Sequence, residues 1–163
     1  MSRDKFYGKY RGVVTDNSDP KSLGRVRAKV QDVLGENESV WATPCVPYAG
    51  KGVGLFLIPP TGASVWFEFE QGDPDHPIWS GCFWADGEPP ATPASAEMKV
   101  LKTDAATITI NDKAGAEAVT IETTNGQKIK LTATDIEIDN GKGATIKLSD
   151  STVKINDQAL EVT

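Results

Sequence analysis

Apolar and polar residues alternate strictly along residues 107–163. Seven pairs of apolar residues occur at positions i and i+2, and each pair encloses one polar residue. The pairs are Ile108/Ile110, Val119/Ile121, Ile129/Leu131, Ile136/Ile138, Ile146/Leu148, Val153/Ile155 and Leu160/Val162. Alternation of period two places each pair on one face of a strand and the enclosed residue on the other. Turn-forming sequences such as Asn125-Gly126 separate the pairs, so the pattern predicts seven short strands joined by short turns.

A single thin sheet of such strands cannot cover its own apolar face, and it leaves both edges unpaired. Several copies wound around a shared axis can cover the face and pair the edges. We therefore predict an obligate homo-oligomer in which all fourteen paired residues face the axis. A single-chain β-solenoid is the competing interpretation, but seven strands would give it few coils.

The rest of the chain has a different composition. All twelve aromatic residues, both cysteines and the single histidine lie between Phe6 and Trp84. Residues 85–96 are rich in proline and small residues, which is typical of an extended connector. We predict a compact domain over residues 1–84, a linker over residues 85–106, and the strand array over residues 107–163.

Short alternating or apolar segments predict that the compact domain is all-β, and no segment has a sustained helical period. The expected strands are Tyr7–Thr15, Gly24–Val30, Val40–Cys45, Leu55–Ile58, Ser64–Glu70 and Ile78–Trp84. Five or six short strands in about 80 residues fit a small barrel, for which the OB-fold is the natural candidate.

Three blocks of the compact domain carry a family resemblance. The first is Gly12–Val14 followed by Asn17–Pro20 and Gly24–Arg27; the second runs from Trp41 to Gly62; the third runs from Val65 to Pro77 and ends at Gly81. Together, and in this order, they resemble the phage baseplate assembly protein V and VgrG family. The resemblance implies a homotrimer with an OB-fold collar and an intertwined triple-stranded β-helix needle. Such proteins form the central spike of contractile phage tails and related injection systems. This spike pierces the target cell envelope.

The resemblance also implies partners and a location. Because the sequence starts directly at the barrel, we expect a separate hub protein at the barrel end. A PAAR-type tip protein is expected at the other end, in contact with Leu160, Val162 and Thr163. The expected location is a virion baseplate or injection-system particle assembled in the cytoplasm of the producing cell, which meets a target membrane only on puncture. A phage, a tailocin and another injection system remain open alternatives.

Candidate catalytic and metal-ligating residues are few. Only about 20 residues separate the domain from the strand array, too few for an inserted enzyme domain, and no histidine or cysteine follows Cys82. Glu68, Glu70, Asp73 and Asp75 could suggest paired carboxylates for glycoside cleavage, but a solvated face and turn is favoured. His76 similarly favours a turn beside Pro77. We expect no catalytic, cofactor or metal site.

The charge balance argues against a nucleic-acid partner. The net charge is −6, which is poorly matched to a phosphate backbone, so Arg25, Arg27 and Lys29 are interpreted as a face for protein or solvent. The runner-up function is an OB-fold binding protein for nucleic acid or glycan with an oligomerising β-stalk; the long strand array favours the spike. Cys45 and Cys82 could form a disulfide, although two buried thiols are the favoured interpretation. The sequence shows neither a long apolar run nor a signal-peptide pattern.

Overall fold

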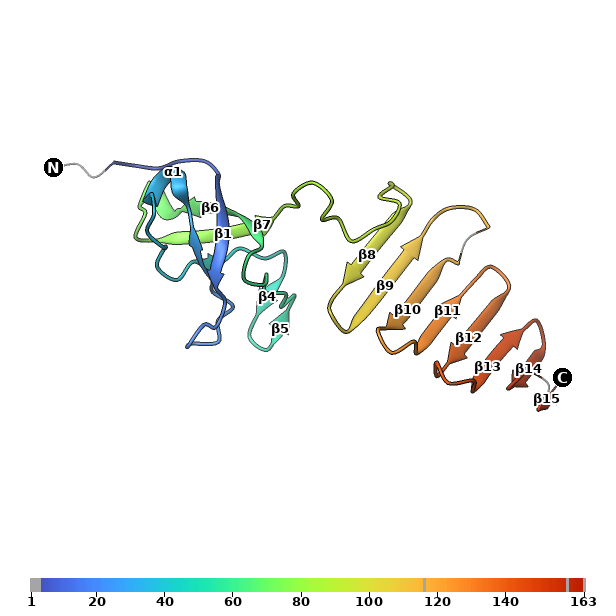
Figure 1. The fold of residues 1–163 in the computed structure, drawn as a ribbon. Coiled ribbons are helices and arrows are strands. Elements are labelled where there is room, and N and C mark those ends of the chain that lie inside the picture. The colour runs from blue at the N-terminus through green and yellow to red at the C-terminus, as the bar shows by residue number, and fades with distance from the viewer. Residues whose placement is uncertain (1–3, 116, 158, 163) are drawn as a thin grey trace. The chain divides into compact units, whose positions relative to one another are not determined.

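The computed structural model describes residues 4–115, 117–157 and 159–162. Within these residues the chain forms two compact units, one on either side of Gly87. Figure 1 shows that both units are built from β-strands. Helical structure in the described part of the chain is limited to the four-residue helix α1 (Gln31–Leu34) and the 3-10 turn η1 (Glu70–Gly72). The all-β fold class predicted from the sequence is confirmed.

The N-terminal unit is a five-stranded sheet with the order β2-β1-β6-β7-β3. Its strands are β1 (Tyr10–Asp16), β2 (Arg27–Lys29), β3 (Thr43–Pro44), β6 (Ser64–Phe69) and β7 (Pro77–Cys82). Neighbouring strands are antiparallel except β3 and β7, which are parallel. A separate two-stranded hairpin, β4 (Ala49–Gly50) and β5 (Val53–Gly54), projects from the connection between β3 and β6.

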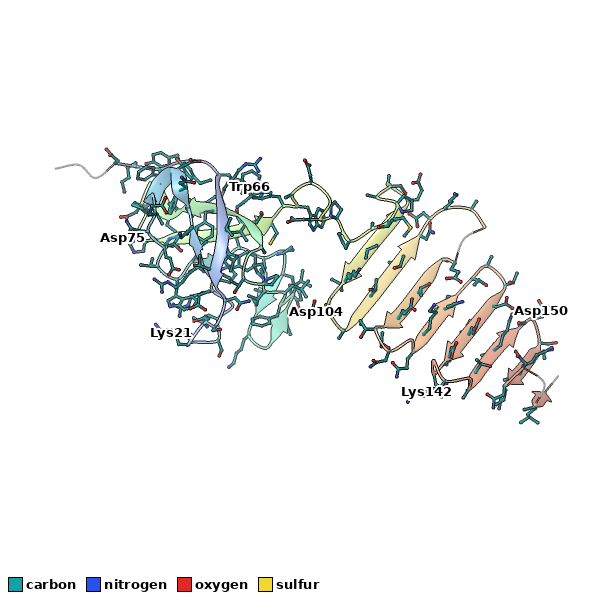
Figure 2. All side chains as sticks on the ribbon, in the orientation of Figure 1. Lys21, Trp66, Asp75, Asp104, Lys142 and Asp150 are labelled. Carbon is teal, nitrogen blue, oxygen red and sulfur yellow. The ribbon has the colours of Figure 1, made fainter. Side chains whose placement is uncertain are left out.

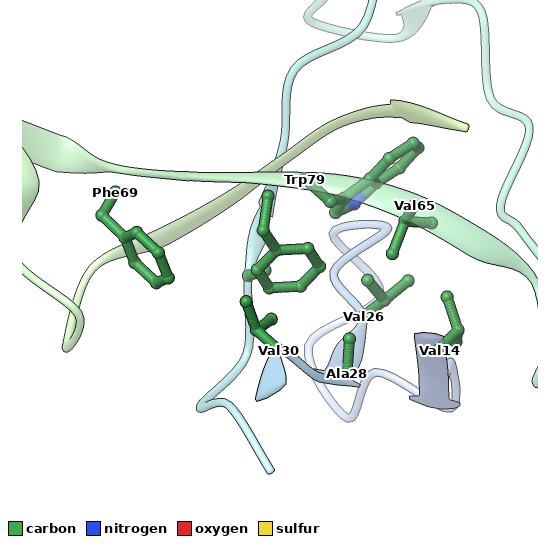
Figure 3. Packing of buried hydrophobic residues seen from close by; sticks show 9 residues of the cluster. Val14, Val26, Ala28, Val30, Val65, Phe69 and Trp79 are labelled. Carbon is green, nitrogen blue, oxygen red and sulfur yellow. The ribbon is translucent and has the colours of Figure 1, made fainter. Parts of the chain in front are cut away.

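Alternating residues of these strands form the core of the unit. Val26, Ala28 and Val30 are fully buried, as are Val65 and Phe67 of β6, and Figure 3 shows these strands presenting their apolar side chains to one another. The alternating residues of the expected strands Gly24–Val30 and Ser64–Glu70 thus place every second side chain in the core. Burial of these side chains removes apolar surface from water, which is the main stabilising contribution to so small a unit.

A loop before β2 is fixed by one ion pair. The Asp19 carboxylate accepts hydrogen bonds from the backbone N–H groups of Lys21, Leu23 and Arg25, and it pairs with the Arg25 guanidinium. The two side chains are only 4% and 15% exposed. The Arg25 guanidinium and these N–H groups hold the pKa of Asp19 well below its usual range. Trp79 donates its indole N–H to the Gly24 carbonyl at 3.1 Å, which joins the end of the loop to the core.

The expected strand Leu55–Ile58 is not a strand. Instead, the extended segment follows the β4–β5 hairpin, and Leu55, Phe56 and Leu57 are largely exposed. The prediction was wrong because an apolar run predicts a strand only where the run is buried. Helix α1 was not expected either, because a single turn is too short to produce a helical period.

The C-terminal unit is an eight-stranded antiparallel sheet in which spatial order follows chain order, β15-β14-β13-β12-β11-β10-β9-β8. Its strands are β8 (Met98–Lys102), β9 (Ala106–Asn111), β10 (Val119–Thr123), β11 (Lys128–Leu131), β12 (Asp135–Asp139), β13 (Thr145–Ser149), β14 (Thr152–Ile155) and β15 (Leu160–Val162). Each predicted apolar pair lies in one of β9–β15. Figure 2 shows Lys142 and Asp150 in connections at opposite ends of the strands.

Strand β8 lies inside residues 85–106, which were expected to be a linker. It pairs with β9 along its whole length, from Met98 opposite Asn111 to Lys102 opposite Thr107. The sequence concealed this strand because apolar residues occupy both of its faces, Met98 and Val100 on one and Leu101 on the other. The period-two signal is therefore lost.

Candidate oligomerisation surface on the C-terminal sheet

The register of the C-terminal sheet aligns the apolar pairs into two continuous rows on one face. Row A consists of Leu101, Ile108, Ile121, Ile129, Ile138, Ile146, Ile155 and Leu160. Row B consists of Ile110, Val119, Leu131, Ile136, Leu148, Val153 and, by register, Val162. Cross-strand neighbours in such rows are close enough to pack against one another.

The two rows are uncovered in the single chain. Leu101 and eleven of the fourteen paired residues are 37–52% exposed, whereas the core residues of the N-terminal unit are at most 6% exposed. A hollow over the sheet is lined by five residues of row A, among them Ile121, Ile129 and Ile146, together with residues of the neighbouring turns such as Asn140. A contiguous apolar face of this length is uncommon on a monomeric protein and marks an interaction surface.

On the opposite, polar face of the same sheet, charged side chains pair with one another. Lys128 pairs with Glu122 at 3.2 Å, and Lys130 pairs with Glu117 at 3.1 Å, which leaves the Lys130 side chain 24% exposed. The hydrogen bond from Lys130 to Glu117 raises the pKa of this lysine and lowers that of the glutamate. Glu137 stands opposite Lys130 on one side and Lys147 on the other. Polar residues at strand centres are thus less exposed than their apolar neighbours, so the uncovered face is the apolar one.

A cluster at the edge of the polar face ties β12 to β13. Ser149 and Thr134 donate hydroxyl hydrogen bonds to the Asp135 carboxylate, and Lys147 approaches the same carboxylate at 3.4 Å. The hydrogen bond from Ser149 is the largest cause of the lowered pKa of Asp135. These contacts support the register that aligns rows A and B, because a slip of one residue would move every apolar side chain to the other face.

One end of row B carries a charge in place of an apolar residue. Lys99 of β8 stands opposite Ile110, and its ammonium group forms an ion pair with Asp112 just after β9. Row A, in contrast, has an apolar residue in β8, because Leu101 stands opposite Ile108. Neither Leu101 nor the Lys99–Asp112 pair was singled out from the sequence. Both follow from the register of β8, which the sequence pattern does not reveal.

The other residues considered from the sequence do not come together into a catalytic arrangement. Glu68 accepts a hydrogen bond from Lys9 at 3.0 Å, and this lowers its pKa. His76 lies in the turn between β6 and β7, where its carbonyl accepts the Glu70 N–H and its imidazole lies 3.9 Å from Asp73. The described residues contain no group of three or more histidine, cysteine, aspartate or glutamate side chains placed to hold a metal ion.

The two cysteines are free and exposed, so the expectation of two buried thiols was wrong. Cys45 directly follows β3, and Cys82 is the last residue of β7. Arg25 and Arg27 lie over the ring of Trp41, and Arg27 also lies 3.5 Å from Glu38. Both arginines therefore have partners within the chain. None of the helices in the described ranges is long and apolar enough to span a membrane.

Of the residues expected to contact a tip protein, Leu160 lies in β15 with its side chain exposed. Val162 is placed by its backbone register opposite Val153. The Val162 side chain and Thr163 lie outside the described residues.

Comparison with known proteins assigns both units. Residues 10–84 match the model of the Type VI secretion system/phage-baseplate injector OB domain. Residues 98–161 match the model of the phage baseplate V C-terminal trimerisation domain. The chain belongs to the phage baseplate V and VgrG family of spike proteins. The second match begins at the first residue of β8 and ends within β15, so the sheet with its two uncovered rows is the family's trimerisation domain.

Curated relatives of this spike-family chain come from Pseudomonas aeruginosa. Type VI secretion system spike protein VgrG1b is 32% identical over 120 residues, which is 67% of this chain and 15% of the relative. Spike protein VgrG1c is also 32% identical over 120 residues, 67% of this chain and 16% of the relative. Spike protein VgrG4b is 36% identical over 85 residues, 48% of this chain and 10% of the relative. The chain therefore spans less than a fifth of the length of these relatives.

Proposed function

We propose that the protein is a trimeric, non-enzymatic spike at the centre of a contractile-tail or injection-system baseplate, where it pierces the target cell envelope. The observation that carries the proposal is the pair of apolar rows, uncovered in one chain, on a sheet that matches a trimerisation domain. Three such sheets wound around one axis would bury rows A and B and pair the free edges of the sheets. The fourteen paired residues would then form the trimer core.

The polar face supports the same arrangement. Lys130, Glu137 and Lys147 stand in one cross-strand line of alternating charge, which suits the outer surface of a shaft in water. A shaft whose backbone hydrogen bonds are all made between strands resists bending and shear. Mechanical puncture requires this stiffness, and it requires no catalytic group.

Two partners complete the proposed particle. A hub protein would seat on the N-terminal unit, and a PAAR-type tip protein would cover the end of the sheet at Leu160, Val162 and Thr163. The exposure of Leu160 in β15 supports the second contact. Pull-down of the tip protein should fail with Leu160→Asp and succeed with Glu137→Gln. Retention of the tip by Leu160→Asp would contradict the assignment.

Solution mass tests the trimer directly. Multi-angle light scattering of the wild type should give three times the chain mass of 17.5 kDa. Ile138→Asp should dissociate the trimer, because three carboxylates would be buried side by side at the axis. Glu137→Gln, one residue away on the opposite face, should remain trimeric. A stable wild-type monomer would refute the proposed assembly.

The proposed piercing of the target cell envelope can be tested with assembled baseplate particles. Particles assembled with the wild-type chain should release potassium from target cells, while particles assembled with Ile138→Asp should not. Particles carrying Glu137→Gln serve as the control and should match the wild type. Full potassium release by particles that contain only the Ile138→Asp chain would show that the trimeric shaft is not the piercing element.

A further inference from the structure

The N-terminal unit carries a second apolar surface, on the hairpin β4–β5 and the segment that follows it. Five exposed large apolar residues line one hollow of about 520 Å³: Leu23, Tyr48, Val53, Leu55 and Phe56. We call these five residues the hairpin surface. Phe56 is 69% exposed, which leaves most of an aromatic ring in water. A cluster of this kind marks an interaction site.

The hairpin surface is fixed in place rather than loose. Leu55 donates its backbone N–H to the Tyr48 carbonyl at 2.8 Å, which extends the pairing of β4 and β5. Gly24 lies so close to this segment that an added Cβ would approach the Ile58 side chain to 2.8 Å. The Asp19–Arg25 ion pair holds the loop that carries Leu23 and Gly24. A preorganised surface loses little conformational entropy when it binds.

The absence of charge indicates a permanent contact. Between Glu38 and Glu68 the sequence has one charged residue, Lys51, although 25% of the whole chain is charged. None of the residues that line the hollow is charged. Depletion of charge is typical of the buried centre of obligate interfaces, whereas transient or nucleic-acid-binding surfaces keep their charges.

The covalent connection to the trimerisation sheet identifies the occupant. Strand β7 ends at Cys82 and β8 begins at Met98, so the connecting residues 83–97 reach about 50 Å at most. Once three sheets share an axis, each N-terminal unit meets its two copies at an effective concentration on the order of millimolar. At that concentration, the N-terminal unit of a neighbouring protomer is the most available partner for the hairpin surface.

We propose that the hairpin surface of one protomer packs against the N-terminal unit of the next in the trimer, as a second, collar-level interface. The inference rests on the proposed trimer. Under three-fold symmetry the contact repeats head to tail and closes into a ring, so each protomer both presents its hairpin surface and receives that of a neighbour.

Thiol accessibility tests the contact in the full-length chain. Cys45→Ser and Cys82→Ser remove both native thiols, and Val53→Cys then places the sole thiol on the hairpin surface. Val13→Cys is the matched control, a strand valine that lies outside the hollow; Val53 and Val13 are 55% and 47% exposed. Each variant is labelled with a water-soluble maleimide, with and without Ile138→Asp, and its mass is measured in parallel.

In the trimer, the thiol at position 53 should react at least about tenfold more slowly than in the Ile138→Asp monomer, because the neighbouring protomer covers it. The thiol at position 13 should react at the same rate in both. Equal rates at position 53 in a sample of confirmed trimer mass would overturn the collar interface and leave the proposed spike standing. Protection that appears only after the hub protein is added would also overturn it. A monomeric mass without Ile138→Asp would remove the proposed trimer and this inference together.

Discussion

Ile138 of β12 stands directly opposite Ile146 of β13, and both side chains lie on the uncovered apolar face of the C-terminal sheet. The same relationship is repeated strand after strand along row A. Shortening one of these side chains by a methylene should therefore have a consequence that depends entirely on whether the face is covered.

Ile138→Val should lower the free energy of unfolding by about 0.5–1.5 kcal/mol per site if the trimer buries row A. The same deletion on an exposed face should cost almost nothing. Leu57→Val is the matched control, since Leu57 is exposed and belongs to neither apolar surface. Thermal unfolding of both variants measures the difference, and equal midpoints would contradict burial of row A.

Asp19→Asn should destabilise the N-terminal unit in a pH-dependent way. Because the folded pKa of Asp19 is lowered, its contribution to stability is complete above the ordinary carboxylate pKa of about 3.9 and is lost as the pH falls below it. The wild type should therefore unfold at a higher temperature than Asp19→Asn at pH 7. The difference should begin to shrink below about pH 4 and should shrink further as the pH falls toward the lowered pKa of the folded state.

The control for this titration is Glu36→Gln. Glu36 lies 3.7 Å from Lys29 on the surface, and an exposed pair of this kind contributes little. Its variant should follow the wild type throughout. A constant difference between wild type and Asp19→Asn from pH 7 to pH 3 would show that the charge of Asp19 is not what stabilises the loop.

Gly141→Ala should be more damaging than Gly143→Ala. Both glycines have positive φ, +70° and +93°, and alanine pays a steric penalty of about 1–2 kcal/mol in the left-handed region. Only at position 141 would the new Cβ also meet a neighbouring turn, because it would approach the Gly126 carbonyl to 2.8 Å. Chemical denaturation should rank the variants in that order, and the reverse ranking would show that the two turns do not lie in contact.

Peptidoglycan cleavage should be undetectable. A general acid for glycoside hydrolysis needs a raised pKa, whereas the hydrogen bond from Lys9 lowers the pKa of Glu68. A turbidity assay with purified peptidoglycan measures this. Turnover that is abolished by Glu68→Gln and retained in Glu70→Gln would overturn the non-enzymatic assignment.

The sequence predicted the C-terminal strands well because each apolar pair is separated from the next by residues that can turn. The period-two signal needs apolar residues on one face only, as in Ile136-Glu137-Ile138. It failed at β8, where Met98 and Val100 lie on the face opposite Leu101. It also failed at Leu55–Ile58, where an apolar run is exposed at the surface. The register that joins the pairs into rows depends on turn lengths and cross-strand contacts, which local alternation does not encode.

The simple order of the C-terminal sheet has a consequence for how such a shaft changes in length. Because every strand from β8 to β15 pairs only with its neighbours in the chain, the topology has no crossover that fixes the number of strands. Insertion or deletion of one complete hairpin would preserve strand direction, both rows and the polar line of charges. Shafts of different reach can therefore arise by duplication of one two-strand segment, such as the 17-residue step from Lys130 to Lys147, without any change to what lies at either end.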